Sequence, residues 1–209
     1  MSSVKTHYVG QPVPYKDAED KVTGKAVYGM DFTLPGMLYA KVLRSPFAHA
    51  KIKKIDTRRA EQVPGVRAVV TGKDVPDARF GLKLLDEYFL SKDEVYYVGD
   101  EVVAVVAVDE KTAAEAVKLI QVEYEPLPAV LDVREAVKPG ALLARGDPQS
   151  NICHHTEIVR GDVEAGFAQA AVVCEETYYL SHQYQSYIEP HAATAQWKNG
   201  RLTVWAPHQ

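Results

Sequence analysis

The sequence lacks the features that would mark it as a membrane or secreted protein. Its longest apolar runs fall far short of the roughly 20 residues that a helix needs to cross a bilayer, so no membrane span is predicted. The N-terminal stretch, MSSVKTHYVGQPVPYK, has no apolar core and is unlike a secretory signal peptide. We therefore expect a cytoplasmic protein.

Cysteine and positive charge are also scarce. Cys153 and Cys174 are the only cysteines, and such a pair is more often two buried free thiols in a reducing compartment than a disulfide. The net charge of −4 argues against binding to the phosphate backbone of nucleic acids. Basic residues do cluster between positions 51 and 59, but they alternate with Ile52 and Ile55 and are interpreted as the solvated side of a strand.

Motifs for nucleotide binding, nucleophilic catalysis and metal binding are missing as well. Neither a phosphate-binding loop ending in Gly-Lys-Ser/Thr nor a three-glycine dinucleotide turn is present, which excludes the kinases and dehydrogenases that use them. No serine or cysteine lies in a nucleophile elbow. Cys153, His154 and His155 are consecutive, so on a strand they would point to opposite faces and not share one zinc ion. His49 has no partner at metal-ligand spacing.

A looser set of polar residues gathers toward the C-terminus: His182, Glu189, His191 and His208. We interpret them as ordinary polar residues of a hairpin rather than as a catalytic group. From residue chemistry alone, the sequence shows no active site.

What is present is an ordinary globular composition with one strongly patterned stretch. Hydrophobic residues make up 46% and charged residues 25% of the 209 residues, enough for one large or two small domains with a real core. Val102 to Val108 is an almost continuous β-branched run, which predicts a strand covered on both faces. Asp109 is a suitable N-cap for an amphipathic helix over Glu110 to Ile120, and a strand over Val122 to Glu125 follows.

The lengths of the elements in this stretch and its turn residues predict how the central strand is connected to the elements after and before it. The helix is long enough to run back along the strand, so a right-handed parallel crossover between the two strands is expected. Upstream, Val95 to Val98 is separated from the central strand by Gly99 and Asp100, which indicates a tight hairpin. One long strand with a bulge at Gly99 is the alternative.

The rest of the chain is predicted from turn and periodicity signals. Strands are expected over residues 37–43, 49–55 and 66–71, with one helical turn over 57–62. Residues 72–93 lose periodicity but are rich in Phe, Leu and Tyr, so the domain itself or a neighbour should cover them. A short helix is expected over 132–138 and another over 163–170, the second capped by Asp162.

After Ala171 the chain becomes rich in β-forming residues. Asn199-Gly200 between two alternating runs is a strong hairpin signal. A hairpin and one long strand leave too much sheet edge uncovered to stand alone, so this second domain is expected to be incomplete. The isolated chain should accordingly self-associate or expose a large apolar patch.

Ordered blocks along the chain resemble one family. They read KVTGKAVYGMDF, LPGMLYAKVLRSPFAHAKI, IDT, VPGVRAVVTGKDVP, VYYVGDEVVAVVA, VEYEPLPAV, GDVEAGFAQA and EPHAATAQW…GRLTVWAPHQ. From about Lys21 to Gln209 the chain resembles the start of the large subunit of the xanthine oxidase family of molybdenum hydroxylases. The block RFGLKLLDEYFLSKDEVYYVGD is most similar to 4-hydroxybenzoyl-CoA reductases, although aldehyde and xanthine dehydrogenases share most of the pattern.

The resemblance implies a fold and a domain order. The fold class is α+β, an α/β hammerhead domain followed by the start of a molybdopterin-binding domain. We expect an extended arm over residues 1–20, the hammerhead domain over 21–135, a linker over 136–160 and the incomplete second domain over 161–209.

The resemblance also implies an activity and a site residue. The complete enzyme would be an oxidoreductase acting on aldehydes, N-heterocycles or aromatic acyl-CoA, with a molybdenum molybdopterin cofactor in its cytosine dinucleotide form. Iron–sulfur clusters and FAD would lie on partner domains or subunits. In the family, a glutamine at the position of Gln209 donates a hydrogen bond to an oxygen ligand of molybdenum. Pro207-His208 precede it here, where most members have Ser-Thr.

Three hypotheses remain open on the sequence. The chain is the N-terminal portion of such a large subunit, a split-gene subunit that assembles with a second polypeptide, or a non-catalytic hammerhead interaction module. On the first two, its partners are the remainder of the large subunit, an iron–sulfur subunit and an FAD subunit. The chain alone is expected to hold no cofactor and to be inactive, because a single donor cannot hold a large dianionic pterin.

Overall fold

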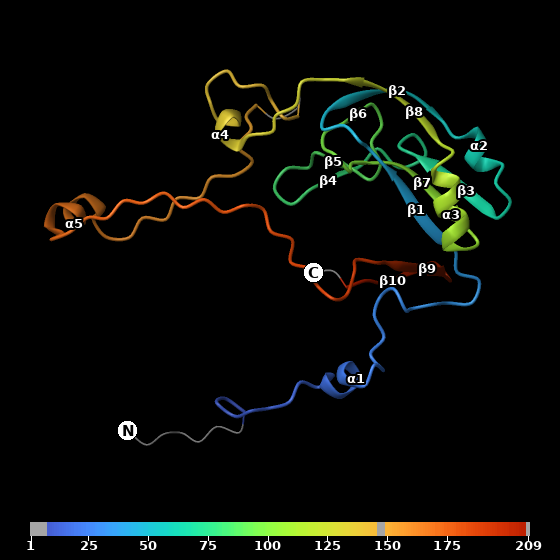
Figure 1. Ribbon diagram of the computed structural model, residues 1–209, viewed down its shortest axis with the longest axis horizontal. Helices are drawn as coiled ribbons and strands as arrows, with labels where there is room; N and C mark the ends of the chain where they lie inside the picture. The colour runs from blue at the N-terminus through green and yellow to red at the C-terminus, as the bar shows by residue number, and fades with distance from the viewer. Residues whose placement is uncertain (1–7, 146–148, 208–209) are drawn as a thin grey trace. The chain divides into compact units, whose positions relative to one another are not determined.

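The computed structural model describes residues 8–145 and 149–207 (Figure 1). Contacts divide the chain into two compact units, which are described separately. The larger spans Gly36–Val173, and the smaller joins the N-terminal residues up to Pro35 with residues from Cys174 onward. The mixture of short helices and antiparallel strands confirms the α+β class. The domain limits given above remain a prediction.

Two three-stranded sheets form the centre of the larger unit, and their ladders are all antiparallel. The first has the order β1-β7-β3, with bounds Tyr39–Arg44, Glu101–Ala107 and Val66–Thr71. The second has the order β6-β2-β8, with bounds Glu94–Val95, Ala50–Asp56 and Gln121–Pro126. The core is a cluster of small and β-branched side chains from both sheets and α3 (Glu110–Val117).

The central strand and its helix form as the sequence predicts. In β7, Val102, Val103 and Val105 are fully buried, and the two adjacent valines show that both faces of the strand are covered. The Asp109 side chain accepts a hydrogen bond of 2.7 Å from the Thr112 amide, which caps α3. The helix packs on β1 and β7 through Ala113 and Ala116 (Figure 1).

The basic stretch of β2 lies on the solvated side of its sheet, as predicted. Ile52 and Ile55 pack against the core, whereas Lys53 and Lys54 pair with glutamates of the neighbouring β8. A shift in register between Ile52 and Lys54 lets two consecutive lysines face solvent. The short helix α2 (Arg58–Glu61) follows, on the predicted helical turn.

Both predicted connections around the central strand are wrong. β7 and β8 belong to different sheets, so α3 links two sheets and makes no parallel crossover within one. Val95 pairs with Ala50 of β2, and Gly99 (φ +102°) lies in a turn that joins the two sheets. Neither the hairpin nor the bulged long strand forms, because β7 finds its partners in β1 and β3, which are distant in sequence.

Residues 72–93 form a small hairpin of β4 (Arg79–Phe80) and β5 (Glu87–Tyr88). Leu90 is buried, but most of the other apolar side chains are not covered by the described parts of the chain. The exposed fraction is 95% for Leu82 and 69% for Leu85, and the stacked rings of Phe80 and Phe89 are about half exposed. We expected either the domain itself or a neighbour to cover these side chains, and the described part of the domain does not cover them.

The later part of the larger unit carries two short helices, α4 (Val133–Ala136) and α5 (Val163–Gln169). Asp132 caps the first, and Asp162 caps the second by accepting from the Ala165 amide at 2.9 Å, as predicted. Cys153 and Cys174 are both free but exposed, so the expected burial of these thiols is wrong. They lie in the stretches 149–162 and 171–188, where the chain is open to solvent along most of its length.

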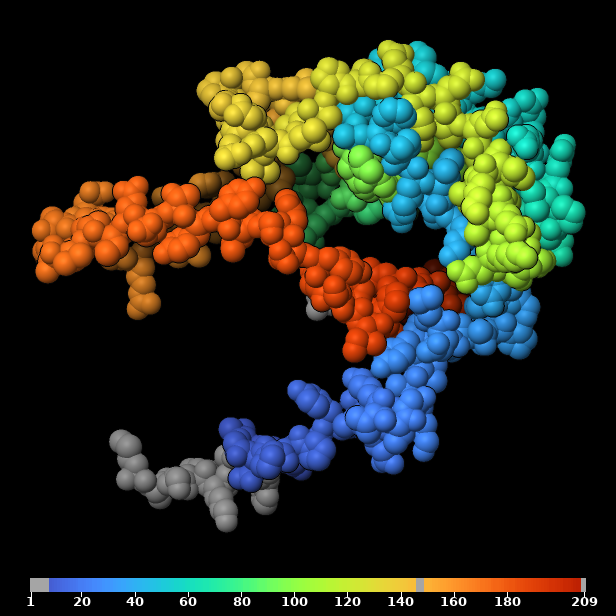
Figure 2. Space-filling model, in the orientation of Figure 1, coloured from blue at the N-terminus to red at the C-terminus, as the bar shows by residue number. Residues whose placement is uncertain are grey.

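The smaller unit contains α1 (Ala18–Val22) and the hairpin of β9 (Thr194–Lys198) and β10 (Arg201–Trp205). Asn199 (φ +52°) and Gly200 (φ +74°) form the turn, and this confirms the hairpin signal. Residues 171–185 run extended without forming a ladder among the described strands, and Figure 2 shows this orange stretch as a narrow strip. No helix in the described parts is long and apolar enough to cross a membrane.

Candidate functional site

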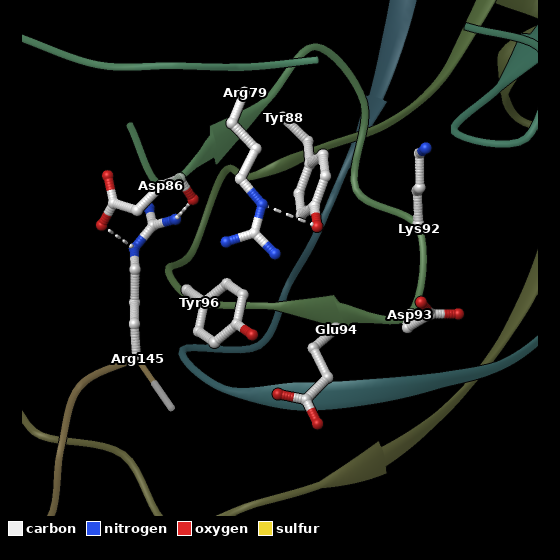
Figure 3. A pocket seen from close by; sticks show the side chains of 8 residues that line it. All are labelled: Arg79, Asp86, Tyr88, Lys92, Asp93, Glu94, Tyr96 and Arg145. Atoms are coloured by element: carbon white, nitrogen blue, oxygen red, sulfur yellow. Dashed lines mark hydrogen bonds and ion pairs between the residues drawn. The ribbon is translucent and has the colours of Figure 1, made fainter. Parts of the chain in front are cut away.

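The larger unit contains a polar cavity of about 400 Å³ beside the β4–β5 hairpin (Figure 3). Its walls come from the hairpin, from the turn into β6 and from the chain after α4. The lining residues are Arg79, Asp86, Tyr88, Lys92, Asp93, Glu94, Tyr96 and Arg145.

The first wall is a cross-strand pair of an arginine and a tyrosine. Arg79 and Tyr88 are opposite each other in the β4–β5 ladder. The Arg79 Nε donates to the Tyr88 hydroxyl at 3.0 Å, and its guanidinium carbon lies 5.0 Å from the ring centroid. The Lys92 Nζ lies 5.5 Å from the same ring and pairs with Asp77. One tyrosine thus orients two cations by cation–π contact.

The second wall is an arginine fixed from both sides. Arg145 donates from Nη1 to the Asp86 carbonyl at 2.6 Å, and its Nε lies 3.3 Å from the Asp86 carboxylate. The guanidinium carbon is 4.9 Å from the Tyr96 ring centroid. Figure 3 shows Arg145 reaching up to Asp86 along one side of the cavity. Because both side chains of this ion pair are about one-fifth exposed, the pair is only weakly screened by solvent.

Glu94 and Tyr96 line the remaining side of the cavity, and His49 contacts both of them without lining the cavity itself. The His49 ring stacks on Tyr96 at 5.4 Å, with Nδ1 2.8 Å from the Pro128 carbonyl and Nε2 3.5 Å from the Glu94 carboxylate. Burial, aided by the negative charge of Glu94, raises the pKa of Tyr96 to about 12. His49, which sequence analysis did not assign to a site, therefore supports the cavity.

The chemistry of this cavity suits binding rather than bond making. Its lining contains three basic and three acidic side chains, and the acidic Asp86 is already paired with Arg145. Tyr96 stays protonated well above neutral pH, so it does not serve as a base. Among the described residues that line it there is no serine, cysteine or histidine.

The residue predicted to touch the cofactor, Gln209, lies outside the described residues, as does His208. The smaller unit does show the strand that leads to them. β10 ends at Trp205, which is opposite Thr194 in the ladder and stacks on Phe32 with ring centroids 4.8 Å apart. Pro207, the last described residue, is half-buried.

The other polar residues of the C-terminal part, as far as the structure describes them, do not form a common site. Glu189 accepts a hydrogen bond from the Gly29 amide at 2.8 Å, and the His191 ring stacks on Tyr187. His182 is exposed. In the described residues no group of three or more His, Cys, Asp or Glu side chains could hold a metal ion, which includes the run from Cys153 to His155.

Sequence reasoning missed the cavity residues, and the reason is distance along the chain. Arg145 and Asp86 are 59 residues apart, and no periodic pattern joins them. The sequence carries one local signal for this site. Arg79 and Tyr88 flank a glycine- and leucine-containing turn, and this spacing is compatible with the hairpin in which the two residues pair.

Comparison with known proteins identifies the class to which this fold belongs. The family model of the aldehyde oxidase and xanthine dehydrogenase a/b hammerhead domain matches residues 23–128, and that of the molybdopterin cofactor-binding domain matches residues 145–209. The chain therefore belongs to the aldehyde oxidase and xanthine dehydrogenase family.

Two curated relatives give the scale of the match. A probable xanthine dehydrogenase subunit of Bacillus subtilis (strain 168) is 43% identical over 92% of this chain and 26% of its own length. The nicotinate dehydrogenase large molybdopterin subunit of Eubacterium barkeri is 35% identical over 90% of this chain and 44% of its own length. The chain thus spans about a quarter of the length of the first relative and a little under half of the second.

Two solved structures match over nearly the whole chain. Quinoline 2-oxidoreductase from Pseudomonas putida 86 has a TM-score of 0.81 at 32% identity, covering 93% of this chain and 26% of that one. Aldehyde oxidoreductase from Desulfovibrio gigas has a TM-score of 0.80 at 30% identity, covering 92% and 23%. Both matches extend over the regions of this chain that the two family models cover.

Proposed function

We propose that this chain is the N-terminal portion of the molybdopterin-binding subunit of a cytoplasmic oxidoreductase that acts on an N-heterocyclic compound. The observation that carries the proposal is the succession of the two domain models along the chain. Of the four relatives named above, three are named for the N-heterocycles xanthine, nicotinate and quinoline and one for aldehydes, and this majority is our reason for proposing an N-heterocycle over an aldehyde or an aromatic acyl-CoA of the 4-hydroxybenzoyl-CoA reductase type.

The cofactor of the complete enzyme is a molybdenum molybdopterin, which we propose to be the cytosine dinucleotide form. When bound, it supplies the redox centre at which the substrate is oxidised. Iron–sulfur clusters and FAD belong to partner domains or subunits, and relatives named as one subunit of a complex support this division.

The described residues fit this cofactor only as part of a larger site. An amide side chain suits a position beside a metal-bound oxygen, because it donates a hydrogen bond without adding charge. The strand β10, held by its ladder with β9, ends at Trp205, four residues before Gln209 in the sequence. A dianionic pterin needs many more donors than one strand end provides, so the remainder of the subunit supplies the others.

Gln209 is the residue of this chain that we propose to act at the molybdenum centre. In the complete enzyme Gln209→Ala should lower turnover roughly 10- to 100-fold, as the loss of a partner that orients a metal ligand typically does. Gln196→Ala is a matched control, since Gln196 is an exposed glutamine of the same hairpin. Unchanged turnover in Gln209→Ala, or an equal loss in both variants, would contradict the role.

Metal analysis and a substrate panel test the proposal as a whole. The complete subunit purified with its partners should contain stoichiometric molybdenum, whereas the 209-residue chain should contain none and show no turnover. Steady-state assays with xanthine, nicotinate, quinoline, benzaldehyde and 4-hydroxybenzoyl-CoA should give the highest kcat/KM with an N-heterocycle. Molybdenum bound by the 209-residue chain would contradict the prediction that this chain alone holds no cofactor. A higher kcat/KM with benzaldehyde or 4-hydroxybenzoyl-CoA would contradict the proposed substrate class.

One observation favours a second arrangement, in which the molybdopterin domains are divided between two polypeptides. The Eubacterium barkeri subunit is matched over 44% of its length, against 26% for the Bacillus subtilis relative, so these two relatives differ in how much of their length lies outside the matched region. Co-purification with a second polypeptide that completes the cofactor site would support it. A complex without molybdenum would favour the non-catalytic module instead.

A further inference from the structure

The smaller unit contains a tight turn that contacts the C-terminal hairpin from the other end of the chain. The Tyr28 amide donates to the Asp31 carboxylate at 3.0 Å, and the Asp31 amide donates to the Tyr28 carbonyl at 2.9 Å. These two bonds close the turn and leave the Gly29 N–H available to a partner outside it. We call residues 28–32 the brace turn.

The brace turn meets both ends of the β9–β10 hairpin. The Gly29 amide donates to the Glu189 carboxylate at 2.8 Å in a part-buried position, just before the chain enters β9. Phe32 stacks on Trp205, the last residue of β10, at 4.8 Å and 29° between ring planes. A charge-assisted hydrogen bond thus holds the segment five residues before β9 to this turn, and an aromatic stack holds the end of β10 to it.

Gly29 is suited to this contact by its size rather than by its backbone conformation. A Cβ added there would lie 3.3 Å from Pro207 Cδ and 3.7 Å from Ala192 Cβ, and its φ is not in the left-handed region. The backbone of the turn therefore approaches Pro207 so closely that a residue with a Cβ would fit only if Pro207 or the turn shifted by a few tenths of an ångström. Pro207 is two residues before Gln209 in the sequence.

From these contacts we propose that the brace turn is a positioning element for the molybdenum site, with Glu189 and Phe32 as its positioning residues. It fixes the chain between Trp205 and Pro207, from which Gln209 follows. This inference rests on the proposed function, because it presupposes that Gln209 acts at the cofactor. Glu189 acts here through its hydrogen bond with the Gly29 backbone amide.

The first test uses the 209-residue chain and needs no cofactor. Glu189→Ala removes the acceptor for the Gly29 amide, so hydrogen–deuterium exchange at Gly29 and in the peptide covering 202–207 should become about tenfold faster. Glu189→Gln keeps an acceptor oxygen and should exchange like the unaltered chain. Glu176→Ala, a change at an exposed residue of the same unit, is the matched control. Equal exchange in Glu189→Ala and the control would overturn the brace.

The second test uses the complete enzyme and separates this inference from the proposed function. Glu189→Ala and Phe32→Leu should keep their molybdenum content but lower kcat several-fold and shift the Mo(V) electron paramagnetic resonance signal in the same direction as Gln209→Ala. A merely structural change would lower the content of loaded enzyme and leave that signal unaltered. If Gln209→Ala shifts the signal and Glu189→Ala does not, the brace is wrong and the function stands. If Gln209→Ala has the same kcat and the same Mo(V) signal as the unaltered enzyme, the proposed role of Gln209 is wrong, whatever Glu189→Ala shows.

Discussion

Val105 occupies the middle of β7, and its side chain is fully buried between the core residues. Replacing it with alanine removes two methyl groups from a site that cannot fully collapse, so Val105→Ala should lower the free energy of unfolding by about 1–3 kcal/mol. Urea denaturation followed by circular dichroism measures this. Val108→Ala is the control, because Val108 is 39% exposed beyond the strand end and should lose much less. Equal losses at the two positions would contradict the assignment of the core.

Two arginine–aspartate pairs of different burial make a second comparison at residue scale. Arg145→Ala leaves Asp86 without a partner in a site where both side chains are about one-fifth exposed, and should cost about 1–3 kcal/mol of unfolding free energy. Arg134→Ala breaks the pair with Asp132, where the arginine is 78% exposed, and should cost much less, because solvent screens an exposed ion pair. Thermal or urea unfolding of both variants checks the order, and a reversed order would refute it.

Two partly buried tyrosines give a pH dependence with a defined sign. Burial raises the pKa of both Tyr96 and Tyr97 to about 12, above the usual value of 10.0. The folded state therefore holds these protons more tightly than the unfolded state, so the stabilising contribution is present below about pH 10 and is lost as pH rises toward 12. Spectrophotometric titration should show phenolate formation near pH 12, reduced by Tyr96→Phe. Ionisation of all tyrosines near pH 10 would count against it.

At the scale of elements, what could be predicted from the sequence was local. The valine run of β7, the caps at Asp109 and Asp162, and the Asn199-Gly200 turn each depend on residues a few positions apart. Their geometry is set before any long-range contact forms, and all four are confirmed.

Pairing between distant strands was not predictable in the same way. The strand lengths around α3 permit a parallel crossover, but β7 pairs with β1 along one edge and with β3 along the other, and no edge is left for β8. The cavity is lined by three segments of the chain that share no sequence pattern, so it could not be predicted from the sequence. Gln209, predicted by resemblance, stays a prediction because it lies outside the described residues.

The β4–β5 hairpin shows how an element can be formed but not covered. Its ladder is only two residues long on each strand, and Leu82 and Leu85 project into solvent. Apolar side chains gathered on one small hairpin are typical of a surface that a further part of a protein covers. The backbone of the extended stretch 171–185 is likewise uncovered, since it forms no ladder with the described strands.

At the scale of the whole molecule, these open surfaces predict association. The 209-residue chain should self-associate in a concentration-dependent way in sedimentation velocity, because burying the apolar hairpin removes it from water. The double change Leu82→Ser and Leu85→Ser should weaken association, whereas Leu131→Ser, at an exposed leucine outside the hairpin, should have little effect. A compact monomer at all concentrations would show that the prediction is wrong.

The contact between Gly29 and Glu189 also sets the order in which the molecule is built during translation. The two residues are 160 positions apart, so at typical elongation rates the N-terminal turn is synthesised on the order of ten to thirty seconds before its partner exists. The larger unit, which ends at Val173, is complete before that time. The N-terminal turn is therefore without this partner while the larger unit is synthesised, and the contact between Gly29 and Glu189 can close only afterwards.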